Sequence, residues 1–331
     1  MRPWRAVTTA SLKAGRIPLW DPHNYNGAPL LENGTSGVLI LDLFSFGRNY
    51  NPSIPAELEY PSHGAIEFLR KQPGLFRTLA LDGALPPNTN AIYGLHEVRG
   101  YNVLDTEAYR RFLAATGDFP QPHGHFRLLY FSSFESRLTD LLNVKYLVST
   151  RELRHPKLTL VWEGGARVYE NRSVLPRAFL AYRSRVLSGR REMDHALSDP
   201  EFDPSAVVLL DGEGPVLSGP ADPSPAVRIA DYQPERVVIE VSTRYDGMLI
   251  LADAWFPGWD VTVDGIPTKL LRGDLILRAV PIPAGHHQVR FRYHPRSFRL
   301  GVRVTGLALV IGVFLVLAGP LLRRRHGEKL S

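Results

Sequence analysis

The stretch VTGLALVIGVFLVLAGPLL, residues 304–322, decides how the rest of the chain is organised. It contains no charged residue, and as a helix rising about 1.5 Å per residue it would reach roughly 28 Å, close to the hydrocarbon thickness of a bilayer. A buried core helix is the alternative, but core helices seldom stay apolar on every face over this length. The stretch therefore predicts a membrane-spanning helix, which we place at residues 301–323, followed by a basic tail at 324–331.

Cations flank both ends of the predicted helix. The tail begins with RRRHGEK, residues 323–329, and the upstream side carries Arg290, Arg292, Arg296, Arg299 and Arg303. The first two upstream arginines fall in a predicted strand of a folded domain, and long domains cross membranes largely regardless of charge, so the compact tail carries more weight. We expect a single-pass protein of the bacterial cytoplasmic membrane, with its body outside the cytoplasm and its tail inside.

Composition limits the classes of function. The chain has 331 residues, of which 44% are hydrophobic, enough for two domains of ordinary size. It has no cysteine, which excludes disulfides, thiol nucleophiles and thiolate zinc sites. The net charge of +6 would suit nucleic acid, but the arginines are spread along strand-like segments and flank the membrane helix, so we expect no nucleic-acid partner. Residues 1–9 lack the pattern of a signal peptide, and a lone C-terminal helix would by itself leave the body in the cytoplasm, against the orientation expected from the tail.

Residues 1–47 are rich in turn-forming residues. The segment PLWDPHNYNGAPLLENGTSGVL, residues 18–39, is punctuated by proline and glycine, and it predicts an ordered loop rather than a strand or helix. Trp20 would stack on a sugar ring, and Asp21 and Asn24 would supply polar contacts, so these three are candidate glycan-binding residues. The alternative is a connecting loop held by Asx turns and proline.

Residues 48–172 alternate between helical and strand-like patterns, which predicts a small α/β domain. No GxGxxG or GxxxxGK pattern occurs in it, so a nucleotide site has no support. Two short strands are separated by the tight Gly164–Gly165 turn. The other expected elements are helices at 62–70, 105–115 and 134–142 and strands at 76–81 and 144–149.

Residues 173–298 read mainly as strands, interrupted by a linker at 211–225 that is rich in Gly, Pro and Ser. The strands recur about every dozen residues with period-2 alternation, which indicates an antiparallel sandwich. Asp264–Gly265 supplies a two-residue hairpin turn. The predicted fold class is therefore α+β, with a small α/β domain followed by an antiparallel β-sandwich and one C-terminal transmembrane helix. The expected strands are 177–187, 206–210, 236–243, 247–255, 259–265, 275–282 and 287–294, with a short helix at 191–198.

Aromatic and acidic residues gather in the segment AWFPGWDVTVDG, residues 254–265. Trp255 and Trp259 beside carboxylates would suit a glycan site, but a structural corner with Trp259 in the sandwich core explains the same residues. The adjacent His286 and His287 would point to opposite faces of a strand, which argues against a metal site. No Ser, His and acid set has a recognisable signature. The residues themselves thus identify no catalytic group, no metal site and no cofactor.

Several stretches together resemble the YfhO family of bacterial multi-spanning membrane proteins, which is similar to the GT-C class of lipid-linked-sugar glycosyltransferases. The resemblance covers about residues 49–325, and residues 1–47 resemble the first extracytoplasmic loop of that family. The family's intervening membrane spans are missing here, so the chain looks like a truncated or internally deleted member. The stretches are YGLHEVRGYNVL (93–104), LLNVKYLVS (141–149), YENRSVLPRAFL (169–180), AWFPGWDVTVDG (254–265) and VPIPAGHHQVRFRYHPRSFRLG (280–301).

The resemblance implies a function in the transfer of sugar from a polyprenyl-phosphate-linked donor to cell-envelope glycans. Membrane lipid, lipid-linked sugar and envelope glycan are the implied partners. In GT-C-like enzymes a carboxylate on an early extracytoplasmic loop acts as general base. Asp21 is the nearest counterpart here, but the family commonly has Asn at that place, so we expect this chain alone to be inactive. The alternative is a non-catalytic, membrane-anchored scaffold that binds glycan or protein.

Overall fold

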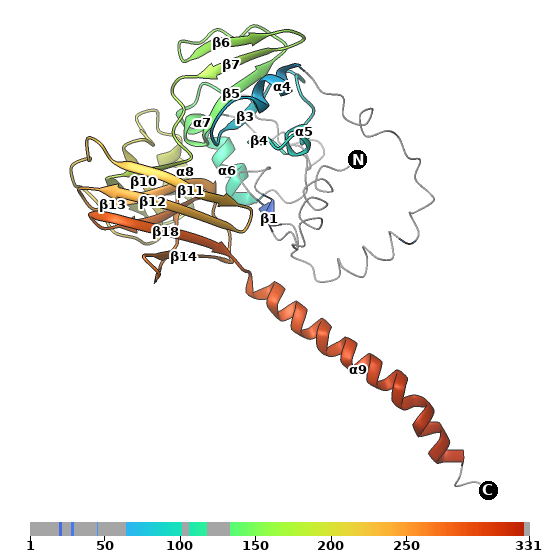
Figure 1. The fold of residues 1–331 in the computed structure, drawn as a ribbon. Helices are drawn as coiled ribbons and strands as arrows, with labels where there is room; N and C mark the ends of the chain where they lie inside the picture. The colour runs from blue at the N-terminus through green and yellow to red at the C-terminus, as the bar shows by residue number, and fades with distance from the viewer. Residues whose placement is uncertain are drawn as a thin grey trace. The chain divides into compact units, whose positions relative to one another are not determined.

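A computed structural model describes residues 20–21, 28–29, 45, 64–100, 106–117 and 133–327, with side chains for those between residues 45 and 314 (Figure 1). The chain forms two compact units, a body within residues 1–30 and 54–293 and a second unit within 31–53 and 294–331. The body contains two parts, one α/β and one built mainly from strands, and the second unit contains one long apolar helix. The predicted α+β fold class is confirmed.

The α/β part is built on a five-stranded sheet in the order β4-β3-β5-β7-β6. Strand β3 is parallel to both β4 and β5, whereas β7 is antiparallel to β5 and β6. The predicted strand at 144–149 coincides with β5. The strands are β3 (Arg77–Ala80), β4 (His96–Glu97), β5 (Val144–Ser149), β6 (Leu158–Glu163) and β7 (Arg167–Asn171).

Helices cover both faces of this sheet because β5 places apolar side chains on alternate sides. Tyr146 and Val148 share a core with α4, whereas Leu147 shares the opposite core with α6 and α7. The side chain of Thr106 accepts a hydrogen bond from the N–H of Tyr109 and so begins α6. The predicted helices are confirmed as α4 (Gly64–Arg70), α6 (Glu107–Ala115) and α7 (Arg137–Leu141), and a further short helix is α5 (Thr89–Ile92).

The second part of the body is a sandwich of two sheets. The six-stranded sheet has the order β8-β13-β17-β16-β10-β9, and the five-stranded sheet has the order β11-β12-β18-β14-β15. The strands of the first are β8 (Ala178–Ala181), β9 (Arg183–Leu187), β10 (Val207–Asp211), β13 (Gly247–Ala254), β16 (Leu271–Gly273) and β17 (Leu277–Ile282). Those of the second are β11 (Ala226–Gln233), β12 (Arg236–Thr243), β14 (Trp259–Val263), β15 (Ile266–Thr268) and β18 (Gly285–Tyr293).

The six-stranded sheet is buried on both faces. Leu249 and Leu251 of β13 pack into the sandwich core with Phe291, whereas Met248 and Ile250 pack on the other side, in the core that contains α6, α7 and α8 (Arg190–Leu197). In Figure 1 helices α6 and α7 lie between the α/β part and the sandwich. Burial on both faces explains why β13 reads as a continuous apolar run rather than an alternating one.

One predicted strand is wrong in its extent. The segment 177–187 reads as a single strand, but it forms β8 and β9, which lie at opposite ends of the strand order and are separated by Tyr182 alone. The Tyr182 ring is buried and its hydroxyl shares a hydrogen bond with Thr243 Oγ1, 2.9 Å away. β9 pairs with β10 in parallel, so this sheet is mixed rather than purely antiparallel.

Part of the predicted linker has a structural role at the edge of β9. The N–H of Ser184 donates to the carbonyl of Leu217 at 3.0 Å, and the Ser184 hydroxyl donates to the carbonyl of Pro215 at 2.5 Å. The N–H of Leu217 donates back to Ser184 Oγ at 2.8 Å. These bonds occupy the outer backbone edge of β9 at this point.

Two further expectations concern turns and loops. The hairpin predicted at Asp264–Gly265 is confirmed, because Val263 pairs with Ile266 and both turn residues have positive φ, +52° and +81°. Within the predicted N-terminal loop, Trp20–Asp21 (β1) pairs with Ala28–Pro29 (β2), so that segment contains two short strands. Periodicity does not detect strands of two residues.

The long helix α9 spans Arg296–Gly327 and begins directly after Pro295. The helix was expected at 301–323, and it starts earlier because the polar segment before the apolar run is also helical. Of the described residues, Arg296–Phe314 forms the one helix long and apolar enough to cross a membrane. Its apolar side chains are exposed, including Phe314 at 68%. An isolated helix with this surface fits a membrane location.

A buried carboxyl group lies at the turn between β16 and β17. Asp274 is fully buried with φ +44°, and its Oδ1 accepts a hydrogen bond from the N–H of Leu209 at 2.9 Å, whereas Oδ2 has no partner. Burial raises the pKa of Asp274 from its ordinary value of 3.8 to about 7. The folded protein therefore holds a proton on this carboxyl that the unfolded chain releases near pH 4.

Replacing Asp274 with Asn should remove a pH dependence of stability. The folded state binds the extra proton between about pH 4 and pH 7, so the free energy of unfolding falls as pH rises through that window, by up to about 4 kcal/mol. Asp274→Asn keeps the acceptor oxygen and tolerates positive φ, so the variant should be more stable than the parent at pH 8. Denaturation of the full chain in detergent micelles at pH 4 to 8, monitored by tryptophan fluorescence, measures the pH dependence of the unfolding free energy and the stability difference at pH 8.

If Asp274→Asn shows the same slope as the parent, the proton is not held at Asp274.

Candidate functional site

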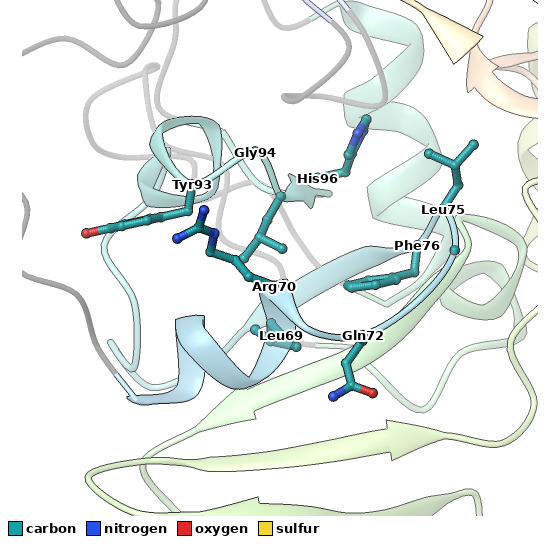
Figure 2. A pocket seen from close by; sticks show the side chains of 10 residues that line it. Leu69, Arg70, Gln72, Leu75, Phe76, Tyr93, Gly94 and His96 are labelled. Atoms are coloured by element: carbon teal, nitrogen blue, oxygen red, sulfur yellow. The ribbon is translucent and has the colours of Figure 1, made fainter. Parts of the chain in front are cut away.

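A pocket of about 180 Å³ opens on the α/β part, between the end of α4 and the segment that follows α5 (Figure 2). Arg70 and Phe76 come from one side, and Tyr93 and His96 come from the other. The volume is below the range of roughly 300–1,000 Å³ typical of clefts for drug-sized ligands. The pocket therefore suits a small ligand such as a single ring.

The first wall is the loop from α4 to β3. Gly74 turns the chain with φ +87°, and the buried Phe76 then packs edge-on against Tyr146 with ring centroids 4.9 Å apart. The amide of Gln72 donates to the carbonyl of Phe68 at 3.1 Å and is engaged within the wall. In Figure 2 this amide points away from the segment that carries Tyr93 and His96. Gln72 thus shapes the pocket and is not directed at a ligand.

The second wall is positioned by Asn90. Its backbone carbonyl accepts from the N–H groups of Tyr93 and Leu95 at 3.1 and 2.9 Å, and its side-chain amide donates to the carbonyl of Leu95 at 3.3 Å. Gly94 adopts φ +70°, a conformation that favours glycine. The hydroxyl of Thr78 donates to the carbonyl of His96 at 3.1 Å. Tyr93 and His96 are therefore held on a wall fixed by backbone bonds.

The polar groups of the pocket are cationic or neutral. In Figure 2 Tyr93 and Arg70 lie towards one end, and Phe76 and His96 towards the other. Arg70 is exposed and forms no ion pair with any residue that the structure describes. None of the described residues that line the pocket is Asp or Glu. A ligand would therefore meet hydrogen-bond donors and aromatic surface.

A buried group of charged side chains, which we call the arginine cluster, joins the α/β part to the sandwich. It consists of Arg77, Arg177, Arg278, Asp253 and Tyr232. Arg77 Nη2 lies 2.7 Å from Asp253 Oδ1, and Arg177 Nη1 lies 3.3 Å from the same oxygen. The hydroxyl of Tyr232 donates to Asp253 Oδ2 at 3.0 Å. One carboxylate thus receives bonds from three elements of the body.

Within the cluster two guanidinium groups, those of Arg77 and Arg177, bind one carboxylate. Burial lowers the pKa of Arg77 and of Arg278 to about 10, so both remain charged at neutral pH. Burial alone would raise the pKa of Asp253, but the surrounding guanidinium groups hold it below its ordinary value of 3.8. Arg177 is 3% exposed, and its Nε and Nη2 atoms have no hydrogen-bond partner. Arg77, Arg177 and Asp253 together therefore carry a net charge of +1.

The pocket and the cluster adjoin each other. Arg77 follows Phe76 in the chain and is the register partner of His96 across β3 and β4. The His96 ring also lies edge-on to Tyr232, with centroids 5.9 Å apart. Tyr232 in turn donates to Asp253, so two contacts link the pocket to the buried charges.

The structure describes the predicted glycan-binding residues only in part. Trp20 and Asp21 form β1, and Asn24 lies outside the described residues. Trp255 is half-buried with the Arg272 guanidinium 4.1 Å above its ring, and it is not among the described residues that line the pocket. The role of these residues in glycan binding stays a prediction.

Trp259, the remaining candidate, is 5% exposed and belongs to the sandwich core. The Arg278 guanidinium lies 3.5 Å from its ring centroid, and the Tyr293 ring lies 5.2 Å away. This is the placement that the structural-corner interpretation describes. Binding of glycan by Trp259 likewise stays a prediction.

No sequence motif marks the residues that line the pocket. They come from two short segments, 69–76 and 93–96, that have no motif of their own. The second segment begins the stretch YGLHEVRGYNVL, which carries part of the family resemblance. This resemblance is the sequence feature that could have pointed to the pocket. Within the described residues no group of three or more His, Asp or Glu side chains comes together as a metal site.

Within the described residues, an α+β body is followed by one exposed apolar helix, an arrangement that fits a membrane protein. Residues 224–305 match the family model described as bacterial membrane protein YfhO. The match covers about a quarter of the chain, from the start of β11 into α9, and confirms the predicted relationship to the YfhO family. No curated protein and no solved structure matched the chain.

Removing the charge of Asp253 should destabilise the body strongly. Asp253→Asn leaves the buried guanidinium groups of Arg77 and Arg177 without their carboxylate, and breaking a buried ion pair from one side costs about 3–5 kcal/mol. Chemical denaturation of the full chain in detergent micelles gives the free energy of unfolding.

Glu240→Gln is the matched control, because Glu240 pairs with Arg228 at 2.6 Å on the exposed face of the five-stranded sheet. Exposed pairs contribute about 0–1 kcal/mol, so this variant should unfold nearly as the parent does. Equal losses in the two variants would show that the cluster does not hold the body together.

Proposed function

We propose that this chain is a membrane-tethered component of lipid-linked sugar transfer to cell-envelope glycans, and that its body binds a sugar instead of catalysing the transfer. The relationship to YfhO and the apolar helix α9 support the membrane setting. The observation that carries the binding function is the pocket, because it combines aromatic surface with hydrogen-bond donors in a volume of about 180 Å³.

The chemistry of the pocket suits a sugar ring. A pyranose presents apolar C–H faces that pack on aromatic rings and hydroxyl groups that need polar partners. Phe76 and Tyr93 provide the aromatic surface, and Arg70 provides a guanidinium group. The walls are fixed by the bonds of Asn90, so less conformational entropy is lost on binding.

The groups that line the described part of the pocket support binding without catalysis. Transfer from a polyprenyl-phosphate-linked sugar needs a general base for the acceptor hydroxyl, usually a carboxylate. The described lining of the pocket contains no carboxylate. We therefore place the chain among the non-catalytic parts of such a system, inactive as a transferase by itself.

We also propose that the body lies outside the cytoplasm and the tail inside, since the RRRHGEK cluster would hold the tail on the cytoplasmic side. Protease added to intact cells that produce the chain should then digest the body and leave the helix and tail. An antibody against the tail would detect the remaining fragment. A body that survives the treatment until the cells are lysed would place it in the cytoplasm and overturn the orientation.

Binding should depend on Tyr93. Tyr93→Ala removes the aromatic surface at one end of the pocket, and we expect sugar affinity to fall about tenfold, equivalent to roughly 1.4 kcal/mol. Glycan-array screening of the full chain in detergent micelles identifies the ligand, and titration calorimetry then measures its affinity.

The control is Tyr245→Ala, which removes an exposed tyrosine between β12 and β13 and should leave affinity unchanged. Circular dichroism verifies that both variants fold. If affinity follows Trp255 and not Tyr93, the site is the predicted tryptophan segment instead of the pocket. A sugar-transfer assay on the same membranes separates binding from catalysis, and turnover abolished by Asp21→Ala would contradict the non-catalytic part of the proposal.

A further inference from the structure

We infer that the sugar bound in this pocket carries a negative charge, either a carboxylate, as in a uronic acid, or a phosphate. The inference rests on the proposed sugar binding and goes beyond it by naming the chemical class of the ligand. It is argued from the charges that line the pocket and from those buried behind it.

The charge inside the pocket is positive. Arg70 extends from the last turn of α4, is exposed, and has no ion pair with any described residue. Its guanidinium can donate two parallel hydrogen bonds to a carboxylate or phosphate. Because no Asp or Glu is found in the described lining, no acidic side chain there competes with a bound anion.

The nearest acid along the chain is already neutralised. Glu97 directly follows His96, but it is 2% exposed and forms an ion pair with Arg99. Arg99 also donates to the carbonyl of Leu85 at 3.1 Å, which fixes the pair inside the body. Glu97 therefore does not reduce the positive charge of the pocket.

The arginine cluster adds to this field from behind. Arg77 lies next to Phe76 in the chain and beside His96 in the sheet, and Tyr232 connects His96 to Asp253. Arg77, Arg177 and Asp253 carry a net charge of +1 and are buried, so water screens this charge poorly. Fixed positive charge behind a concave surface raises the affinity for anions in front of it.

The size of the pocket limits which anion fits. A volume of about 180 Å³ accommodates one ring and not a dinucleotide or an extended polyanion. Aromatic surface from Phe76 and Tyr93 would be of little use to a free inorganic anion. A single ring with one charged substituent satisfies both the apolar surface and the cations.

Matched pairs of sugars test the inference directly. For the full chain in detergent micelles, titration calorimetry compares methyl glucoside, galactoside and mannoside with the corresponding methyl uronides and 6-phosphates, and with inorganic phosphate and acetate. We expect the charged member of at least one pair to bind at least tenfold more tightly than its neutral partner. The preference should shrink as salt is raised from about 0.02 to 0.5 M, because screening weakens charge attraction.

Arg70 variants locate the charge preference. Arg70→Gln should remove most of it while leaving the affinity for the neutral sugar nearly unchanged, and Arg70→Lys should keep part of it. Arg154→Gln is the control, since the Arg154 side chain is 84% exposed and pairs with Glu152. The control should bind every ligand as the parent does.

The outcomes separate this inference from the proposed function. Equal affinity for charged and neutral sugars, lost in Tyr93→Ala, would overturn the charge preference and leave sugar binding in place. No binding of any sugar would overturn the proposed function itself. Inorganic phosphate that binds as tightly as the sugar phosphate would show a simple anion site and also overturn the inference. The class that binds more tightly, uronides or sugar phosphates, then identifies which anionic group the site selects.

Discussion

The ion pair between Arg77 and Asp253 is the interaction on which the body depends. Arg77 belongs to the sheet of the α/β part and Asp253 to the sandwich, and their side chains meet at 2.7 Å with no exposure to solvent at Arg77. The same guanidinium donates to the carbonyls of Leu142 and Ala252 at 2.9 and 2.5 Å. A charge buried this deeply is tolerated only when its partners are in place, so the two parts have to fold against each other.

The position of the pocket follows from this constraint. Because Arg77 is tied to Asp253, the backbone on both sides of it is fixed, including Phe76 in the pocket wall and the pairing of β3 with β4 that places His96. The excess of guanidinium groups is costly for folding, since Arg177 leaves two nitrogen atoms without partners. Proteins accept a cost of this kind mainly at functional sites, where the buried charge takes part in binding or catalysis.

The sequence predicts the elements that depend on local patterns. The strands at 144–149 and 236–243 coincide with β5 and β12, because apolar residues, β-branched or aromatic in most cases, mark both segments. The change of sheet edge at Tyr182 depends on a contact with Thr243, 61 residues away, and no local pattern contains it. The same holds for the candidate site. Arg77 and Asp253 are 176 residues apart in the sequence. The pocket joins two segments that carry no motif of their own. Trp255 and Trp259, by contrast, are candidates for glycan binding only because tryptophan is the kind of residue that stacks on sugars.

The bonds between Ser184 and the linker affect how the protein behaves at high concentration in a membrane. An uncovered edge strand offers its free N–H and C=O groups to any neighbouring chain, and this is a common start of aggregation. Here the carbonyl of Leu217 accepts the backbone N–H of Ser184 on β9, and the Ser184 hydroxyl bonds to Pro215 and Leu217. A proline- and glycine-rich segment is suited to this work, because it covers a strand without forming one that other molecules could extend. The linker has to be long enough to reach this edge.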